Sequence, residues 1–259
     1  MLLHGLGSSA RIWDLTAPYL IDRFRVMALD QRGHGLSDRP DSDYTFTEVC
    51  GDLQALMEAT GLKRPVLVGH SWGASVALQF ACDHPHDVRA LALVDGGMGE
   101  ISSRLTWEEA ERMMMPPPID GVAVDVFVNF ARKWPQLGEA WSPQVQEMVL
   151  SNFEIRDGRV YRRLRVPNHM KVVRAMYEMK ATQLYPRVRC PALLIPAFRE
   201  PTSDQETAWQ NHRRDGLEAA LRLLPHASLL AMEDTIHDVP VQRPRELAAV
   251  ITEFAAGLS

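Results

Sequence analysis

The fold is decided by residues 66–73, which read Val66-Leu67-Val68-Gly69-His70-Ser71-Trp72-Gly73. An apolar run comes before the first glycine, and residues 74–82 favour a helix. A serine between a buried strand and a helix is held in a tight turn, and flanking glycines let neighbouring backbone approach without a Cβ clash. The pattern predicts a nucleophile elbow, a turn that points the Ser71 hydroxyl out of a sheet.

A G-x-S-x-G pattern arises by chance in many chains, so the surrounding sequence must support it. Upstream, His4-Gly5-Leu6-Gly7 follows two leucines, and residues 30–37, Asp-Gln-Arg-Gly-His-Gly-Leu-Ser, follow the apolar residues 26–29. Downstream, His237 comes after the strand-like residues 228–232. Acidic residues between Ser71 and His237 allow the chain order serine, acid, histidine, which this type of turn requires.

The H-G-x-G motif at residues 4–7, the segment 30–37 and the G-x-S-x-G turn at residues 69–73 together resemble the motifs of the α/β-hydrolase fold family. The resemblance runs along essentially the whole chain. The resemblance implies an α/β fold, a mostly parallel sheet with helices on both faces, plus a helical cap insertion. In that family the H-G-x-G segment follows the third strand, so two opening strands are missing here. We therefore expect either a truncated start or a sheet that opens with residues 1–3, with a sheet edge that lacks its usual cover.

Strand and helix patterns alternate along the chain, as in proteins with parallel sheets. Strands are expected at residues 26–30, 65–70, 90–94, 191–196 and 228–232. About ninety residues separate the expected strands at 90–94 and 191–196, far more than an ordinary connection needs. This segment is rich in helix formers, aromatics and methionines, which favours a helical cap with an apolar pocket. The predicted organisation is a core at residues 1–97, the cap at 98–189 and the rest of the core at 190–259.

The composition is that of an ordinary globular enzyme, with 46% hydrophobic and 24% charged residues. The net charge of -5 comes from interspersed acidic and basic residues, so no basic stripe favours nucleic acid or a membrane as partner. No run approaches the roughly 20 apolar residues of a membrane helix, and no signal peptide is recognisable. Cys50, Cys82 and Cys190 have no C-x-x-C spacing, which favours a reducing compartment, and we expect a cytoplasmic location.

A serine hydroxyl is a weak nucleophile at neutral pH and needs a base within hydrogen-bond reach. His237 is the candidate base. His226 is expected to be exposed, and His84 and His86 are expected in a surface loop, where no second pair of ligands lies at a spacing that suits a metal. We therefore expect no metal site and no cofactor.

Three further histidines belong to the motifs. The resemblance implies that His4 stabilises the H-G-x-G loop. His34 and His70 are expected to be structural, the latter packed under the elbow.

The imidazole needs a carboxylate that fixes its tautomer and stabilises the imidazolium. The resemblance implies an acid about five residues beyond the strand that follows the cap, which is Glu200. The glycine usual in that segment is missing, and the adjacent Arg199 allows a plain surface ion pair instead. Asp95, at a position that some family members use, and Asp204 are the alternatives.

Negative charge on the carbonyl oxygen needs backbone N–H donors. By position, these are the N–H groups of Leu6 and Trp72, and the Trp72 ring is also a candidate pocket wall.

The sequence predicts a carboxylesterase-like serine hydrolase that cleaves an ester or related acyl bond of a small apolar substrate, with water as co-substrate. A C–C bond hydrolase, a lactonase and a cofactor-free peroxidase use the same triad in related proteins, and fold and triad do not decide among them. A ligand-binding or sensor protein on this scaffold is the alternative of another class. Substrate identity and oligomeric state are not predicted.

Overall fold

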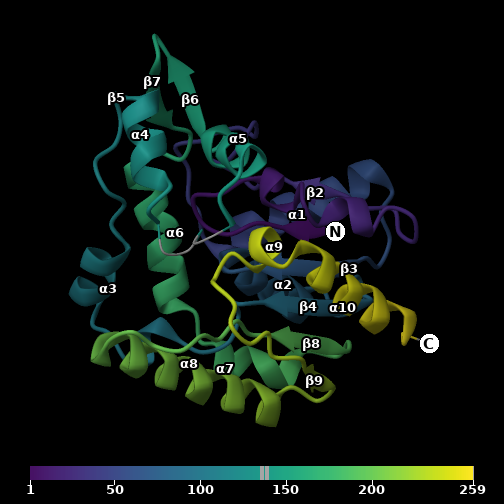
Figure 1. The fold of residues 1–259 in the computed structure, drawn as a ribbon. Coiled ribbons are helices and arrows are strands. Elements are labelled where there is room, and N and C mark those ends of the chain that lie inside the picture. The colour runs from purple at the N-terminus through teal and green to yellow at the C-terminus, as the bar shows by residue number, and fades with distance from the viewer. Residues whose placement is uncertain (135–136, 138–139, 259) are drawn as a thin grey trace.

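A computed structural model describes residues 1–134, 137 and 140–258. Its main element is a six-stranded sheet in the order β2-β1-β3-β4-β8-β9 (Figure 1). All neighbouring strands in this sheet are parallel. The strands are β1 (Leu2–Leu3), β2 (Ala28–Leu29), β3 (Val66–His70), β4 (Ala90–Val94), β8 (Ala192–Ile195) and β9 (Ala227–Leu229). The predicted α/β fold and its five expected strands are confirmed, with ends that differ by at most three residues.

The strand at the start of the chain, β1, lies inside the sheet between β2 and β3. Both of its leucines are buried. Residues 2 and 3 therefore form an interior strand, and the sheet edge on this side is β2, whose Ala28 is exposed.

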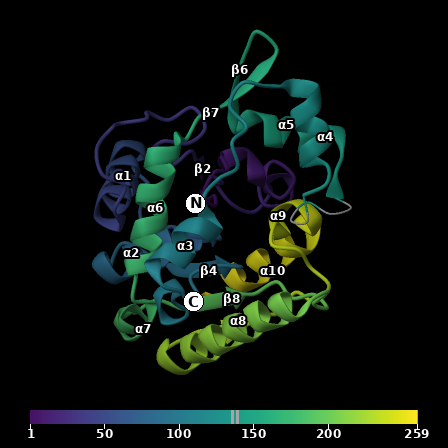
Figure 2. The ribbon, with the colours of Figure 1, turned by 90° about the vertical axis from the view of Figure 1, so that its left-hand side faces the viewer.

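Helices cover both faces of the sheet, and alternate residues of each strand face opposite layers. On β4, Leu91 and Leu93 pack in one core with α1 (Phe46–Thr60) and α2 (Trp72–Asp83), whereas Ala92 and Val94 pack in a second core with α9 (Val239–Gln242) and α10 (Pro244–Ala256). The remaining sheet helix, α8 (Asp204–Leu223), lies beside β9 (Figures 1 and 2). Short 3₁₀ helices occupy Ala10–Trp13, Ala17–Tyr19, Ile101–Ser103 and Tyr185–Arg187.

The segment between β4 and β8 holds the helices α3 (Trp107–Met114), α4 (Val124–Ala131), α5 (Pro143–Ser151), α6 (Val166–Glu178) and α7 (Ala181–Leu184). It also holds an antiparallel sheet in the order β5-β7-β6, from β5 (Val122–Ala123), β6 (Phe153–Arg156) and β7 (Arg159–Arg162). Of these elements, α4, α5 and the β6–β7 hairpin stand off one end of the sheet in both views, and the segment returns to the core through α7, which packs against α2 and α8 (Figures 1 and 2).

The description of this segment as purely helical is therefore incomplete. The hairpin of β6 and β7 turns at Asp157 and Gly158, which both have positive φ, at 51° and 69°. An Asp-Gly pair between apolar-polar alternation is a strong hairpin signal because both residues tolerate this backbone conformation. The signal was present in the sequence, and the helix-forming composition around it obscured it.

Candidate active site

Ser71 lies in the turn between β3 and α2, with φ 55° and ψ −122°. A non-glycine residue in this region is strained and persists only where its surroundings hold it. Its N–H donates to Val94 O over 2.9 Å, which ties the turn to the neighbouring strand. Gly96 lies so close that a Cβ there would be 2.1 Å from Ser71 O. The predicted strand-turn-helix geometry around Ser71 is present.

Asp95 follows β4 directly and is almost fully buried, with 2% of its side chain exposed. Its Oδ2 accepts a hydrogen bond from His237 Nδ1 over 2.6 Å. Its Oδ1 accepts from the Ala197 backbone N–H over 2.8 Å and is paired with the Arg213 guanidinium of α8. Burial by itself would raise the pKa of Asp95, but the bond to His237 and the nearby positive charges hold it below its usual range. The structure therefore brings Asp95, one of the alternative acids, to the histidine.

Glu200, the acid favoured by the sequence, does not reach His237. Among the described residues it has no hydrogen bond or ion pair, and it lines a small cavity with Arg199 and Arg214. Arg199 pairs with Glu206 instead, over 2.7 Å. Asp204 is the first residue of α8. Among the described residues it forms no hydrogen bond or ion pair with His237.

This correction has a simple cause. β4 and β8 are adjacent and parallel, with Val94 opposite Ile195. The carboxyl ends of the two strands therefore meet at one edge of the sheet, and an acid after either strand can reach the same histidine. The sequence lacks the usual glycine after β8, which was the signal against Glu200.

His237 lies in the loop between β9 and α9, and its side chain is 44% exposed. Partial burial opposes its charged form, but the hydrogen bond and the charge of Asp95 raise its pKa. Because Nδ1 donates to Asp95, neutral His237 leaves Nε2 as a proton acceptor. No hydrogen bond joins Ser71 Oγ to this ring among the described residues, and such bonds often tighten only when substrate binds.

His70 connects the elbow with the histidine loop. Its Nε2 donates to the His237 carbonyl over 2.8 Å, and the two rings are 4.8 Å apart between centroids. Burial lowers its pKa to about 3, so the ring is neutral. The expected structural role under the elbow agrees with this position.

One group of potential metal ligands lies here, since His70, His237 and Asp238 each offer a ligand atom within 4.8 Å of the others. Burial raises the pKa of Asp238 to about 6. Both histidines already donate hydrogen bonds, to a backbone carbonyl and to Asp95. To bind a metal through Nδ1, His237 would have to break its hydrogen bond to Asp95, which orients the ring.

The H-G-x-G loop lies against the elbow. A Cβ on Gly5 would be 3.0 Å from Ser71 Cβ, so only glycine fits there without displacing the serine. His4 Nδ1 donates to Gly5 O over 2.7 Å, and its Nε2 accepts from the Gln31 N–H over 3.0 Å. Gly7 N–H donates to His34 Nε2 over 3.1 Å. Burial lowers the pKa of His4 to about 4 and that of His34 to about 3, so both rings are neutral and able to accept these bonds.

Neither of the two candidate oxyanion donors has an acceptor for its N–H among the described residues. Trp72 is the first residue of α2, and the N–H groups of a first helical turn have no acceptor within the helix. For Leu6, no acceptor of its N–H is recorded in the described part of the chain. The Trp72 ring, however, is 1% exposed and stacks on His34 at 5.2 Å, so the idea that it forms a pocket wall is wrong.

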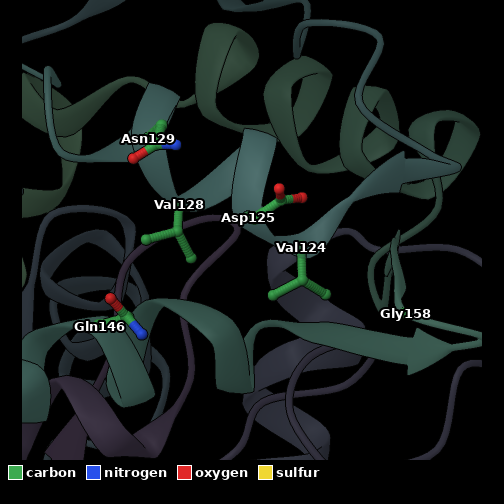
Figure 3. A pocket seen from close by; sticks show the side chains of 6 residues that line it. All are labelled: Val124, Asp125, Val128, Asn129, Gln146 and Gly158. Atoms are coloured by element: carbon green, nitrogen blue, oxygen red, sulfur yellow. The ribbon is translucent and has the colours of Figure 1, made fainter.

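A cavity of about 520 Å³ lies elsewhere, beside α4 and α5 (Figure 3). It is lined by Val124, Asp125, Val128, Asn129, Gln146 and Gly158. None of these residues belongs to the candidate site. No described helix is long and apolar enough to cross a membrane.

Comparison with known proteins places this geometry in a family. Residues 1–165 match the model of the alpha/beta hydrolase fold. A 2-(acetamidomethylene)succinate hydrolase of Mesorhizobium japonicum is 35% identical over 95 residues, which are 37% of this chain and 34% of that protein. The crystal structure of E-2-(acetamidomethylene)succinate hydrolase superposes with a TM-score of 0.77 at 21% identity, covering 99% of this chain and 90% of that one. The enol-lactonase from Burkholderia xenovorans LB400 gives 0.70 at 20% identity, covering 98% and 90%.

The alignments with curated relatives span between 28% and 44% of those proteins' length. The match to the family covers more than half of this chain and includes the H-G-x-G loop, the elbow and the start of the inserted segment. The chain belongs to the α/β hydrolase fold family.

Proposed function

We propose that this protein is a serine hydrolase that cleaves a carboxylic ester or a related acyl bond. Ser71 attacks the carbonyl carbon, and His237 takes its proton and passes it to the leaving group. Water, activated by the same histidine, then releases the acyl group from Ser71. Asp95 orients His237 and stabilises the imidazolium, in the role first given to Glu200.

One observation carries this proposal. The hydrogen bond of 2.6 Å between His237 Nδ1 and Asp95 Oδ2 leaves Nε2 as the acceptor, in a loop that His70 ties to the elbow. A buried carboxylate with a low pKa beside a histidine with a raised pKa is the arrangement that general base catalysis needs.

The backbone N–H groups of Leu6 and Trp72 would hold the oxyanion. Both N–H groups belong to residues close to Ser71, because the H-G-x-G loop packs on Ser71 and α2 begins with Trp72, directly after Ser71. The helix dipole of α2 adds to the positive potential at this point.

The names of the similar proteins, a succinate-derivative hydrolase and an enol-lactonase, support hydrolysis of a carbonyl compound. The segment 98–189 would act as a cap, and Ile119, Phe153 and Leu164 give its cavity an apolar lining that fits a small acyl chain. The three cysteines are free and buried, in keeping with a cytoplasmic location.

The test is labelling with a fluorophosphonate probe, which reacts with an activated serine. The parent protein should label, and the variants Ser71→Ala and His237→Ala should not. Glu200→Gln and Asp204→Asn are the matched controls for Asp95→Asn, because all three remove one carboxylate charge. A folded parent that fails to label would contradict the proposal and favour a ligand-binding protein on this scaffold.

A further inference from the structure

A second cavity, of about 140 Å³, lies over the H-G-x-G loop. Gly7 forms part of its wall, together with the apolar side chains of Ile119, Phe153 and Leu164. Gly7 is two residues beyond Gly5, which touches Ser71, and two residues of chain reach at most about 7 Å. The wall of the cavity at Gly7 therefore lies within about 7 Å of the glycine that touches Ser71.

Arg162 brings a positive charge to this cavity. It is the last residue of β7, and its side chain is only 10% exposed. One Nη atom donates to Pro117 O, and the other forms an ion pair with Oδ1 of the half-exposed Asp120 at 3.7 Å, a distance too long for a hydrogen bond. That oxygen already accepts from the Arg162 backbone N–H over 2.7 Å. The guanidinium thus keeps donors free for another acceptor.

Among the residues that the structure describes, no carboxylate lines the cavity. The neighbouring His169 donates from Nε2 to Met114 O over 3.0 Å, and burial keeps its ring neutral by lowering its pKa. Arg162 is therefore the charged group of this lining, and an occupant with a negative charge would be attracted.

Asn152 gives a second, independent sign that a ligand belongs here. It lines the same cavity, and its buried Oδ1 has no hydrogen-bond partner in the described part of the chain. Buried amides in folded proteins are normally paired. A half-turn of this side chain presents its NH₂ group in place of the oxygen, so it can donate to an anion beside Arg162.

We propose that Arg162 and Asn152 bind the carboxylate of a small acyl substrate, so that the preferred substrate is a half-ester of a short dicarboxylic acid. The methylene groups contact Ile119, Phe153 and Leu164, and the carboxylate pairs with the guanidinium. A cavity of this size holds a group of about six heavy atoms, as small apolar cavities of about 150 Å³ that bind benzene do. This inference rests on the proposed function for its catalytic step and deepens it by naming the substrate class.

The test compares monoethyl succinate with ethyl 4-methylpentanoate, in which an isopropyl group replaces the carboxylate. In the wild type, kcat/KM should be about tenfold to a hundredfold higher for the anionic ester, since a hydrogen bond to a charged group is worth that factor. The variant Arg162→Gln should lose most of this preference while it still hydrolyses the neutral ester. Arg159→Gln is the matched control, because Arg159 is an exposed arginine of the same strand and should leave the preference unchanged.

A wild type that hydrolyses both esters without preferring the anionic one overturns the inference, whatever the variants do. So does an unchanged preference in Arg162→Gln. If Arg162→Gln does not fold, Asn152→Ala replaces it, and an unchanged preference there counts against the subsite. Calorimetry separates the two proposals: if the wild type cleaves neither ester, but Ser71→Ala binds monoethyl succinate and the double variant Ser71→Ala/Arg162→Gln does not, the subsite is sustained and the hydrolase is contradicted.

Discussion

His237 Nδ1 donates to Asp95 Oδ2 over 2.6 Å, although the two residues are 142 positions apart in the chain. The acid follows β4, and the histidine lies in the loop after β9, on the far side of β8. Asp95 is held by the Ala197 N–H and by Arg213 as well, so its carboxylate has a fixed orientation. The predictions below follow from this contact and its neighbours.

Asp95→Asn should lower kcat by about 10⁴-fold, because an amide in place of the carboxylate favours the wrong tautomer of the histidine. The measurement is steady-state hydrolysis of p-nitrophenyl butyrate. Glu200→Gln should keep kcat within about twofold, since surface changes away from a site have little effect. Equal losses in the two variants would contradict the assignment of the acid.

Arg213→Gln should shift the acidic limb of the kcat/KM profile to higher pH. The Arg213 charge disfavours protonation of His237 and lowers its pKa, so its removal makes the ring easier to protonate. His237 must be neutral to act as base, and activity should therefore fall at a higher pH than in the wild type. Arg214→Gln, a variant of the same helix, is the control and should keep the wild-type profile. If the kcat/KM profiles of Arg213→Gln and Arg214→Gln coincide, Arg213 does not have this role.

Leu6→Pro should lower kcat by about 10²- to 10³-fold, because proline removes the N–H proposed to hold the oxyanion. Leu6→Ala keeps that N–H and should lose far less activity. Thermal melting of both variants checks that the loop is intact. A Leu6→Ala variant as slow as a folded Leu6→Pro variant would mean that the side chain matters and the backbone donor does not.

Gly73→Ala and Gly51→Ala should have opposite effects on stability, although both glycines are helical. A Cβ on Gly73 would lie 2.5 Å from Leu3 O, which is backbone of the interior strand β1, so α2 would be forced off the sheet. Around Gly51 nothing lies within 4 Å, and alanine there should add about 0.5–1 kcal/mol to the free energy of unfolding. Denaturant unfolding measures both, and a neutral Gly73→Ala would show that the helix can shift at little cost.

Stability should fall as the pH is lowered from about 6.5 toward 3. Burial lowers the pKa of His4 to about 4 and those of His34 and His70 to about 3, so the unfolded chain binds protons that the folded chain does not. The free energy of unfolding therefore rises with pH across this window. Asp238 acts in the opposite direction, because its raised pKa of about 6 lets the folded state hold a proton that the unfolded state loses.

Unfolding by urea at pH 7 and pH 5.5 measures this dependence. His34→Gln should weaken it, whereas the exposed His86→Gln should not. A free energy of unfolding that is flat over this interval would mean that the buried rings become protonated without cost.

The elements of the sheet were predictable because their signals are local. Apolar runs bounded by turn residues predicted five strands, and the helix at α1 begins after Thr45, whose hydroxyl accepts from the Glu48 N–H over 3.4 Å. The hairpin at Asp157 and Gly158 was also signalled locally, but it was missed among helix formers.

The sequence by itself determined the elbow at Ser71, the loop at residues 4–7 and the parallel sheet that joins them. The elbow and the loop depend on glycines that lie too close to neighbouring residues for a Cβ, and the sheet depends on apolar runs bounded by turn residues. Only the tertiary structure decided which acid meets His237 and which cap side chains face the loop. Strand neighbours and the course of a long insertion depend on packing between distant residues, so Glu200 and Asp95 could be told apart only once β4 and β8 were seen side by side.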